Sequence, residues 1–277
     1  CAQHGLTFLG PSPGIMERMG LKVPAKRAMR AAGLAGIPGS DGLLASVDEA
    51  REVAESVGYP LILKADAGGG GRGLRRCSGP DDLAEAWSQA SAEAEAAFGN
   101  GALYLERYLT GGRHIEVQVL GDGFGSAVHL GERECSIQRN HQKLIEESPS
   151  PILNDEKRAE MGAAAVRLIK HAGYHNAGTV EFLVDRNLDY YFMEVNARIQ
   201  VEHTVTEMVT GIDLIQEQIR LASGEPLGYT QDDIEFRGHC IECQINAEDP
   251  SRDFQPSPGL VSSFVPPGGP GVRMDSH

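Results

Sequence analysis

The pattern of apolar and polar positions first predicts a small unit that mixes strands and helices. β-rich runs at residues 59–65 and 102–108 flank a helical stretch at residues 81–98, in which acidic residues come first, alanines follow and Gly99 stands at the end. The glycine-rich segment 68–73 comes soon after the first run. We expect these elements to form a small α+β lobe with a loop at one edge.

A larger unit is predicted to follow. Residues 114–119 and 126–130 have the pattern of paired strands, and residues 179–185 and 189–196 predict a second hairpin. A helix is expected over residues 155–171, because acidic residues open it and basic residues close it.

A long helix is expected over residues 205–221. Four apolar side chains recur there at helical spacing, which predicts that they share one face of the helix. They are Met208, Ile212, Ile215 and Ile219.

Length and charge narrow the class of protein. At about 150 residues per domain, 277 residues predict roughly two domains. The formal net charge is −14 and only 6% of residues are aromatic, so the chain is a poor candidate for binding nucleic acid. It has no apolar run long enough to predict a membrane-spanning helix and no visible secretory leader, so we expect a cytoplasmic protein. Both ends look cut, which favours interpretation as a fragment.

The five cysteines do not predict a disulfide framework, because they are few and scattered. Cys240 and Cys243 have the spacing of a zinc ligand pair, but no second such pair completes a site. We interpret them as thiols of a buried strand.

The glycine-rich segment is a candidate for phosphate binding. Backbone without side chains can approach an anion closely, and Lys64 and Arg72 flank it with positive charge. The segment lacks the Gly-Lys-Ser/Thr of a Walker A loop, and a plain surface loop is the alternative.

The hairpin at residues 179–196 predicts a metal site. If Asp185 pairs with Tyr190, Leu183 lies opposite Phe192 and Glu181 lies opposite Glu194. Two carboxylates facing each other repel unless a cation lies between them, and carboxylate oxygens are common Mg²⁺ ligands. Two solvated surface glutamates are the alternative.

The segment after this hairpin strengthens the case for a site. Residues 194–202 alternate polar and apolar side chains, so an extended chain would place five polar groups on one side. These are Glu194, Asn196, Arg198, Gln200 and Glu202. A further polar cluster at residues 138–143 fits either a functional loop or a solvated turn.

Taken together, these motifs resemble the biotin carboxylase component of biotin-dependent carboxylases, a branch of the ATP-grasp superfamily. The resemblance covers essentially the whole chain and rests on several stretches. These are residues 8–12, 64–73, 113–118, 141–143, 196–203 and 245–250.

The resemblance implies an α+β ATP-grasp fold, with a small glycine-loop lid lobe and a larger lobe of mixed and antiparallel sheet with helices. Residues 1–36 would be a remnant of an N-terminal Rossmann-like lobe. Residues 37–109 would form the lid, and residues 110–277 the core with the truncated start of a C-terminal region.

It also implies a nucleotide site. Lys22 and Lys64 would hold phosphates under the backbone of Gly70 and Gly71. The adenine would lie against the hinge at Glu106, Arg107, Tyr108 and Leu109. Further nucleotide contacts would come from His114, Gln138 and His141.

The remaining implied residues concern metal and bicarbonate. Glu181, Glu194 and Asn196 would hold Mg²⁺ or Mn²⁺, in agreement with the hairpin argument above. Lys143, Arg198 and Val201 would bind bicarbonate, with Gln244 at a bicarbonate and biotin position, and Glu202 would be the general base.

The implied activity is an ADP-forming ligase reaction in two steps, which makes carboxyphosphate from ATP and bicarbonate and then carboxylates biotin. Biotin on a carrier protein would be the substrate, a carboxyltransferase the further partner, and a homodimer the assembly. The setting would be that of an acyl-CoA carboxylase, such as the acetyl-CoA carboxylase of fatty acid synthesis.

The sequence departs from the family at Gln244, where the family has an arginine. A hydrogen bond to a charged group contributes about 1.5–3 kcal/mol against about 1 kcal/mol for a neutral one, so slower carboxylation is expected. Milder departures are Leu21, Ala67, Asn140 and Thr204. Two alternatives therefore remain: a non-catalytic ATP-binding homologue, and another ATP-grasp ligase such as carbamoyl phosphate synthetase.

Overall fold

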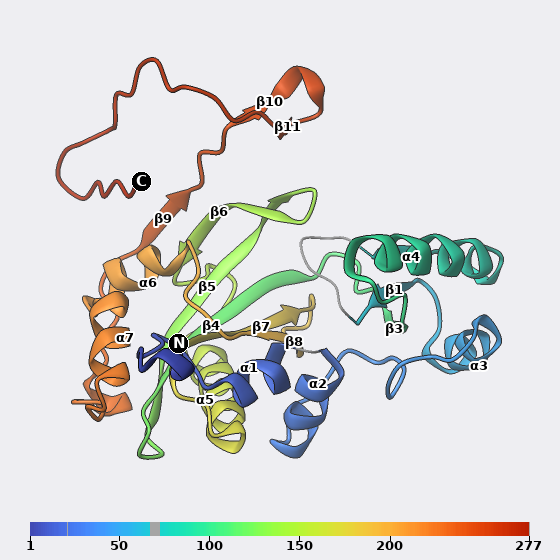
Figure 1. The fold of residues 1–277 in the computed structure, drawn as a ribbon, viewed down its shortest axis with the longest axis horizontal. Helices are drawn as coiled ribbons and strands as arrows, with labels where there is room; N and C mark the ends of the chain where they lie inside the picture. Colours follow the sequence, from blue (N-terminus) through green and yellow to red (C-terminus); the bar gives the residue numbers. More distant parts are fainter. Residues whose placement is uncertain (21, 67–72, 277) are drawn as a thin grey trace. The chain divides into compact units, whose positions relative to one another are not determined.

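The computed structural model describes residues 1–20, 22–66 and 73–276, and divides the chain into two compact units, residues 1–243 and 244–277 (Figure 1). The predictions for Gly70, Gly71 and Arg72, and the departures from the family at Leu21 and Ala67, lie outside the described residues. Over the described ranges, no helix combines the length and apolar character needed to cross a membrane.

The first unit contains two antiparallel sheets. The smaller has the strand order β2-β1-β3, formed by β1 (Leu61–Ala65), β2 (Leu74–Cys77) and β3 (Leu103–Arg107). The larger has the order β8-β7-β4-β5-β6-β9. Its strands are β4 (Arg113–Gly121), β5 (Ala127–Arg139), β6 (Gln142–Ser148), β7 (Asn176–Val184), β8 (Tyr190–Asn196) and β9 (Cys240–Cys243).

Helices cover these sheets. The small sheet packs against α3 (Val47–Val57) and α4 (Leu83–Phe98), and the large one chiefly against α5 (Asp155–Ala172). The other helices are α1 (Pro13–Gly20), α2 (Lys22–Ala31), α6 (His203–Thr210) and α7 (Leu214–Ala222). Short 3₁₀ turns are Ala2–His4, Pro80–Asp82, Gln231–Asp233 and Pro250–Arg252. The second unit contains the small pair β10 (Glu248–Asp249) and β11 (Gln255–Pro256).

Local sequence explains where the two longest helices end. Gly99 follows α4 and Gly173 follows α5, and both adopt left-handed backbone, with φ of 67° and 63°. In α4 the buried Ala86, Ala90 and Ala94 repeat every four residues, which places them in one stripe. The predicted α+β class and the helix predictions at residues 81–98 and 155–171 are confirmed.

The prediction of one long helix at residues 205–221 is wrong. Gly211 adopts a φ of 73° and ends α6, and the Asp213 side chain then accepts a hydrogen bond from the Gln216 N–H at the start of α7. The predicted apolar face is also not buried, since Met208, Ile215 and Ile219 are 43–49% exposed. The apolar spacing was real, but a left-handed glycine and a capping aspartate interrupt it.

The interpretation of the cysteine pair is half right. Residues 240–243 do form a strand, β9, which pairs with β6. It lies at the edge of the large sheet, however, and Cys243 is exposed while Cys240 is partly exposed. Edge position explains why these thiols are not buried.

Candidate functional site

One face of the large sheet carries buried polar side chains where strands β4, β5 and β7 lie side by side. Along β4, Ile115, Val117 and Val119 point into the main hydrophobic core. The alternate residues His114, Glu116 and Gln118 therefore point to the opposite face. Glu116 lies directly between Arg133 of β5 and Glu181 of β7 in the sheet register. Strand alternation and register thus place one basic and two acidic side chains in a row, with Glu116 in the middle.

Arg133 is the centre of this polar face and is fully buried. Its guanidinium forms an ion pair with Glu116 and donates to the Oε1 atoms of Gln118 and Gln200 at 2.6 and 3.0 Å. It also donates to the hydroxyls of Thr206 at 2.9 Å and Thr179 at 3.2 Å. One side chain therefore ties β4, β7, the segment before α6 and α6 itself to β5.

Lys143 of β6 gathers three carboxylates around its ammonium. Its Nζ lies 2.6 Å from Glu202 Oε1 and 3.1 Å from Glu181 Oε1, and it also contacts Glu116 Oε2. All three glutamates are buried. The cluster holds three carboxylates against Lys143 and Arg133, and His114 Nε2 lies 3.1 Å from Glu181 Oε2, so a protonated His114 would be its third cation.

These contacts set the protonation of the cluster. Burial by itself would lower the pKa of Lys143, but the three carboxylates outweigh it and raise that pKa. Burial would raise the pKa of Glu181, but His114 and Lys143 outweigh it and hold that pKa well below its usual range. The pKa of Glu116 is likewise lowered, against burial, by Arg133 and Lys143. Both glutamates are therefore ionised at neutral pH, as metal or cation binding requires.

The hairpin brings Glu181 and Glu194 opposite each other, as predicted, but by a different register near the turn. Val184, not Asp185, pairs with Tyr190, so Phe182 rather than Leu183 lies opposite Phe192. A register shift between Phe182 and Glu181 then restores the predicted glutamate pair. The predicted pairing of Leu183 with Phe192 is wrong, because the connecting loop is one residue longer than expected.

The segment after Glu194 does not form the extended strand that was predicted. β8 ends at Asn196, residues 197–202 form an irregular turn, and α6 begins at His203. Three of the five polar side chains nevertheless meet. Asn196 donates to Glu181 Oε1 at 2.8 Å, Gln200 donates to the same atom at 3.2 Å, and Glu202 contacts Lys143. The turn, rather than strand alternation, brings these side chains together. It is held by Gln200, whose amide oxygen accepts from Arg133 and whose amide nitrogen donates to Glu181.

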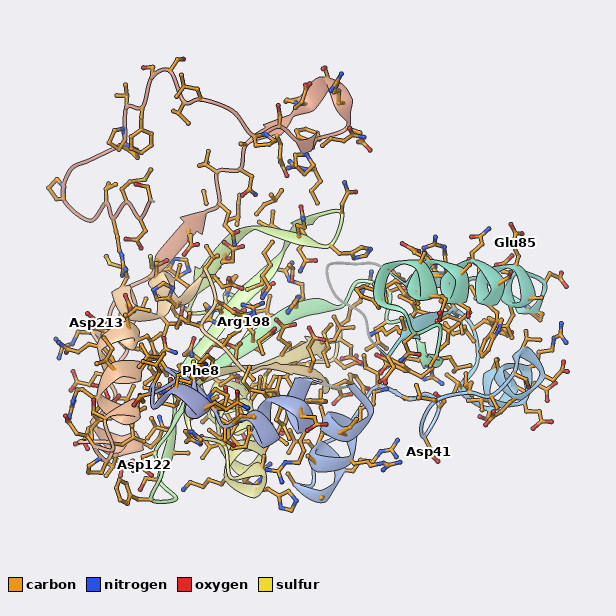
Figure 2. All side chains as sticks on the ribbon, viewed as in Figure 1. Phe8, Asp41, Glu85, Asp122, Arg198 and Asp213 are labelled. Carbon is orange, nitrogen blue, oxygen red and sulfur yellow. The ribbon has the colours of Figure 1, made fainter. Side chains whose placement is uncertain are left out.

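Two other predicted residues of this segment lie differently. Arg198 is exposed (Figure 2) and donates to the carbonyl of Ile199 at 3.1 Å. Val201 is 63% exposed. Gln138 lies 2.9 Å from His114 Nδ1, while His141 is exposed in the turn between β5 and β6. Gln244 belongs to the second unit.

The small sheet carries a second charged group, which α2 completes. Glu106 of β3 is buried and forms ion pairs with Lys64 of β1, at 2.7 Å, and with Lys26 of α2. Arg107 donates to the carbonyl of Val57 at 2.6 Å, and Tyr108 donates its backbone N–H to Pro60 O at 2.9 Å. Leu109 follows in the link to β4, and the Lys22 side chain lies outside what the structure describes.

The chain near residue 39 covers Glu106 closely. Ser40 donates its backbone N–H to Leu105 O at 2.9 Å, and a Cβ at Gly39 would lie 2.2 Å from that same oxygen. Glycine is therefore required at position 39 for this approach.

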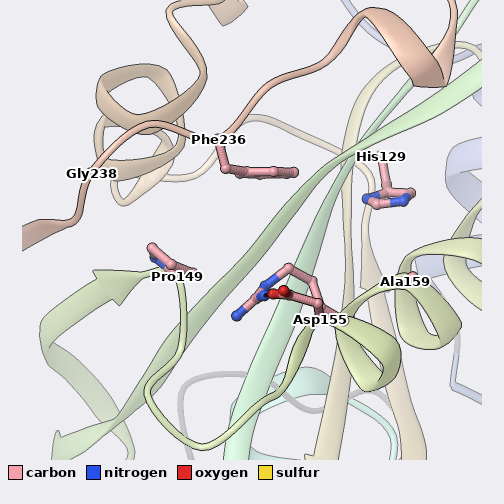
Figure 3. A pocket seen from close by; sticks show the side chains of 7 residues that line it. His129, Pro149, Asp155, Ala159, Phe236 and Gly238 are labelled. Carbon is pink, nitrogen blue, oxygen red and sulfur yellow. Dashed lines mark hydrogen bonds and ion pairs between the residues drawn. The ribbon is translucent and has the colours of Figure 1, made fainter.

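A separate cavity of about 370 Å³ lies away from these groups (Figure 3). His129, Pro149 and Phe236 are among its lining residues, with Arg158 on α5. Arg158 is already bound by Glu132 and Asp155. None of the predicted site residues lines it.

Sequence reasoning missed Glu116, Arg133 and Lys26. Glu116 lies within residues 113–118, one of the stretches that carry the family resemblance. Its alternation with Ile115 and Val117 indicates that it lies on the face opposite to the apolar one. Arg133 and Lys26 carry no sequence signal, because a buried cation looks like a surface one until its partners are known. Among the described residues, two groups have ligand atoms within 4.8 Å of one another: His114, Glu116 and Glu181, and Glu116, Cys135 and Glu202.

Two known families match this chain. Residues 22–230 match the family described as carbamoyl-phosphate synthase L chain, ATP binding domain, and residues 242–277 match the biotin carboxylase C-terminal domain. The chain is 54% identical over all 277 residues to biotin carboxylase of Nostoc sp., of which it covers 62%. The chain belongs to the biotin carboxylase family.

Solved structures of this family are also similar. A biotin carboxylase–β,γ-ATP complex from Campylobacter jejuni is 52% identical, with a TM-score of 0.95 over 99% of this chain and 61% of that one. The biotin carboxylase domain dimer of Hydrogenobacter thermophilus 2-oxoglutarate carboxylase, in complex with MgADP, ADP and bicarbonate, is 50% identical. Its TM-score is 0.96 over 99% of this chain and 60% of that one. The chain thus spans about three fifths of the length of these relatives, and the ATP-grasp fold is confirmed.

Proposed function

We propose that the protein carries out the ATP- and bicarbonate-dependent carboxylation of biotin. The observation that carries this proposal is the position of Lys143, whose ammonium contacts Glu202 and Glu181 together. Lys143 could hold bicarbonate. Beside it lie Glu202, which could take the proton of bicarbonate, and Glu181, which could hold a metal ion. The comparisons support the proposal, since relatives that are 53% and 54% identical to this chain bear the name biotin carboxylase.

In the proposed first step, Glu202 removes the proton of bicarbonate while Lys143 and Arg198 hold the anion, with Val201 beside it. The resulting oxyanion attacks the γ-phosphorus of ATP, ADP leaves and carboxyphosphate forms. Positioning and charge neutralisation dominate such a transfer. Carboxyphosphate then breaks down to CO₂ and phosphate. The phosphate takes the N–H proton of the biotin ureido group, and that nitrogen bonds to the carbon of CO₂.

The residues present fit a magnesium or manganese ion. Glu181 and Glu194 are paired across the hairpin, Glu181 is held ionised, and Asn196 still has an amide oxygen to offer when its nitrogen donates. When bound, the ion would neutralise charge on the phosphates. In the protein itself, Gln200 and Asn196 hold the Glu181 carboxylate in place.

For the nucleotide, we propose that Lys22 and Lys64 bind the phosphates and that the hinge Glu106–Leu109 holds the adenine, with His114, Gln138 and His141 nearby. Biotin would arrive on a carrier protein or domain, a carboxyltransferase would take the product, and the protein would act as a homodimer. All five cysteines are thiols rather than disulfides, which is consistent with the reducing cytoplasm.

The test is bicarbonate-dependent ADP release, with and without free biotin, from the protein expressed from its complete reading frame. We expect Lys143→Met and Glu202→Gln each to lower kcat/KM by about 100-fold or more. Lys157→Met is the matched control and should leave activity unchanged, because Lys157 pairs with its helix neighbour Glu160, lies over the Tyr190 ring and contacts none of the proposed site residues that the structure describes. ADP release that ignores bicarbonate would contradict the proposal, and ammonia-dependent carbamoyl phosphate formation would favour the other ligase.

One observation favours a second candidate function. Gln244 stands where the family has an arginine, so the chain could bind MgATP without turning over. Activity that appears only in Gln244→Arg would establish this non-catalytic role, whereas activity in both forms would exclude it.

A further inference from the structure

Glu106 holds two lysines where one would neutralise it. Lys64 reaches its Oε2 from β1, and Lys26 reaches its Oε1 from α2. Glu106 is 2% exposed and Lys26 is 8% exposed. The Lys26 ammonium also lies 4.2 Å from the centre of the Tyr104 ring, which gives it a second favourable contact.

The charges in this group are unequal. Burial would raise the pKa of Glu106, but Lys64 and Lys26 outweigh it and lower that pKa, so the carboxylate is ionised. Burial lowers the pKa of Lys26, partly opposed by Glu106. With both lysines charged, two cations share one anion, and one positive charge is left over.

This excess matters because a lone buried ion pair is hard to separate. Removing one partner leaves an uncompensated charge in a low-dielectric site. If Glu106 had only Lys64, that lysine could not turn to another anion without leaving the carboxylate bare. With Lys26 in place, Glu106 keeps a partner when Lys64 leaves.

We propose that Lys26 is a positioning residue which frees Lys64 from Glu106 to bind the phosphates of the nucleotide. The inference rests on the proposed nucleotide site. Lys26 itself does not contact the nucleotide. It stays beside Glu106 as the counter-ion from α2, whereas Lys64 of β1 is the lysine that moves.

The experiment compares ATP and adenosine binding by calorimetry in the protein from its complete reading frame. In Lys26→Met, which keeps an apolar stem over Tyr104, we expect the Kd for ATP to rise by about 10- to 100-fold, the loss of one charged interaction. The Kd for adenosine, which has no phosphates, should stay within about twofold. Lys26→Arg should retain most of the ATP affinity. Arg30→Met is the matched control, because Arg30 lies on the same helix but pairs with the exposed Asp41.

A double variant separates this role from a structural one. In Glu106→Gln the carboxylate that retains Lys64 is gone, so adding Lys26→Met should weaken ATP binding no further. Equal losses for ATP and adenosine in Lys26→Met, or a full additional loss in the double variant, would overturn the inference. If the wild-type protein binds neither ATP nor adenosine, the proposed function is wrong. If it binds both, the variants test the role of Lys26 alone.

Discussion

The two faces of the six-stranded sheet are made by the same strands but are held together differently. On one face, Ile115, Val180 and Phe182 pack into a core that also includes side chains of α5. On the other, Glu116, Arg133 and Glu181 are just as buried, but ion pairs and hydrogen bonds fix their positions. An apolar face tolerates small changes of shape, whereas a buried charge needs each partner in place. The polar face is therefore the more fragile of the two and the more informative about function.

The largest effect should come from Arg133→Met. Glu116 would keep only Lys143 of its two cationic partners and four neutral acceptors would lose a donor, so we expect the free energy of unfolding to fall by about 3–5 kcal/mol. Urea unfolding at pH 7 measures this. Arg27→Met, at an exposed position on α2, should change it by less than about 0.5 kcal/mol. A loss no larger than that of the control would mean that the polar face does not depend on its central cation.

Removing a single partner of Arg133 should cost less. Thr206→Val keeps the shape of the side chain but leaves one guanidinium donor without its 2.9 Å acceptor, so we expect a loss of about 1–3 kcal/mol. Gln200 and Glu202 lie on the segment that leads into α6, so bicarbonate-dependent turnover should also fall. The same change at the exposed Thr110 is the control. Unfolding midpoints measure the loss of stability, and kcat/KM measures the loss of activity. A loss of stability with unchanged kcat/KM would contradict the expected fall in turnover.

Asp122 sharpens the comparison, because neutral N–H groups rather than cations hold its carboxylate. Its Oδ1 accepts from the backbone N–H groups of Phe124 at 2.9 Å and Ser126 at 2.8 Å, and its Oδ2 accepts from the backbone N–H of Leu227 at 3.2 Å. Burial would raise the pKa of Asp122, but these bonds outweigh it and lower that pKa.

The stability that Asp122 contributes is accordingly present above its ordinary pKa of 3.8 and is lost as pH falls through the lower folded value. We expect Asp122→Asn to cost about 1–2 kcal/mol at pH 7, where a charged acceptor becomes a neutral one. The difference from wild type should shrink below pH 3.8. Unfolding curves at pH 7 and at acid pH measure it, and a constant difference across that range would contradict the assignment.

The smallest effect is expected on the apolar face. Ile115→Val removes one methylene group from the core and should cost about 0.5–1.5 kcal/mol. Turnover per folded molecule should not change, although Ile115 directly precedes Glu116 in β4. A fall in turnover comparable to that of Thr206→Val would show that the two faces are not independent.

Much of the fold follows from local sequence. Alternation in β4 and β7 and the glycines after α4 and α5 were sufficient to place those elements. The failed prediction at residues 205–221 shows the limit, because spacing alone does not reveal that Gly211 adopts a left-handed conformation. For the site, the facing of Glu181 and Glu194 was predictable, while the loop length that sets the register was not.

The sequence by itself determined the family and the chemistry offered: a glycine-rich segment, paired glutamates, and the run that ends in Glu202. Only the tertiary structure decided which charges meet. It brings Lys143 onto three glutamates from 27 to 59 residues away along the chain, buries Arg133 beneath them, and gives Glu106 a second lysine from α2. The reason is physical, since the energy of a charge depends on its burial and its neighbours, and neither is written in local sequence.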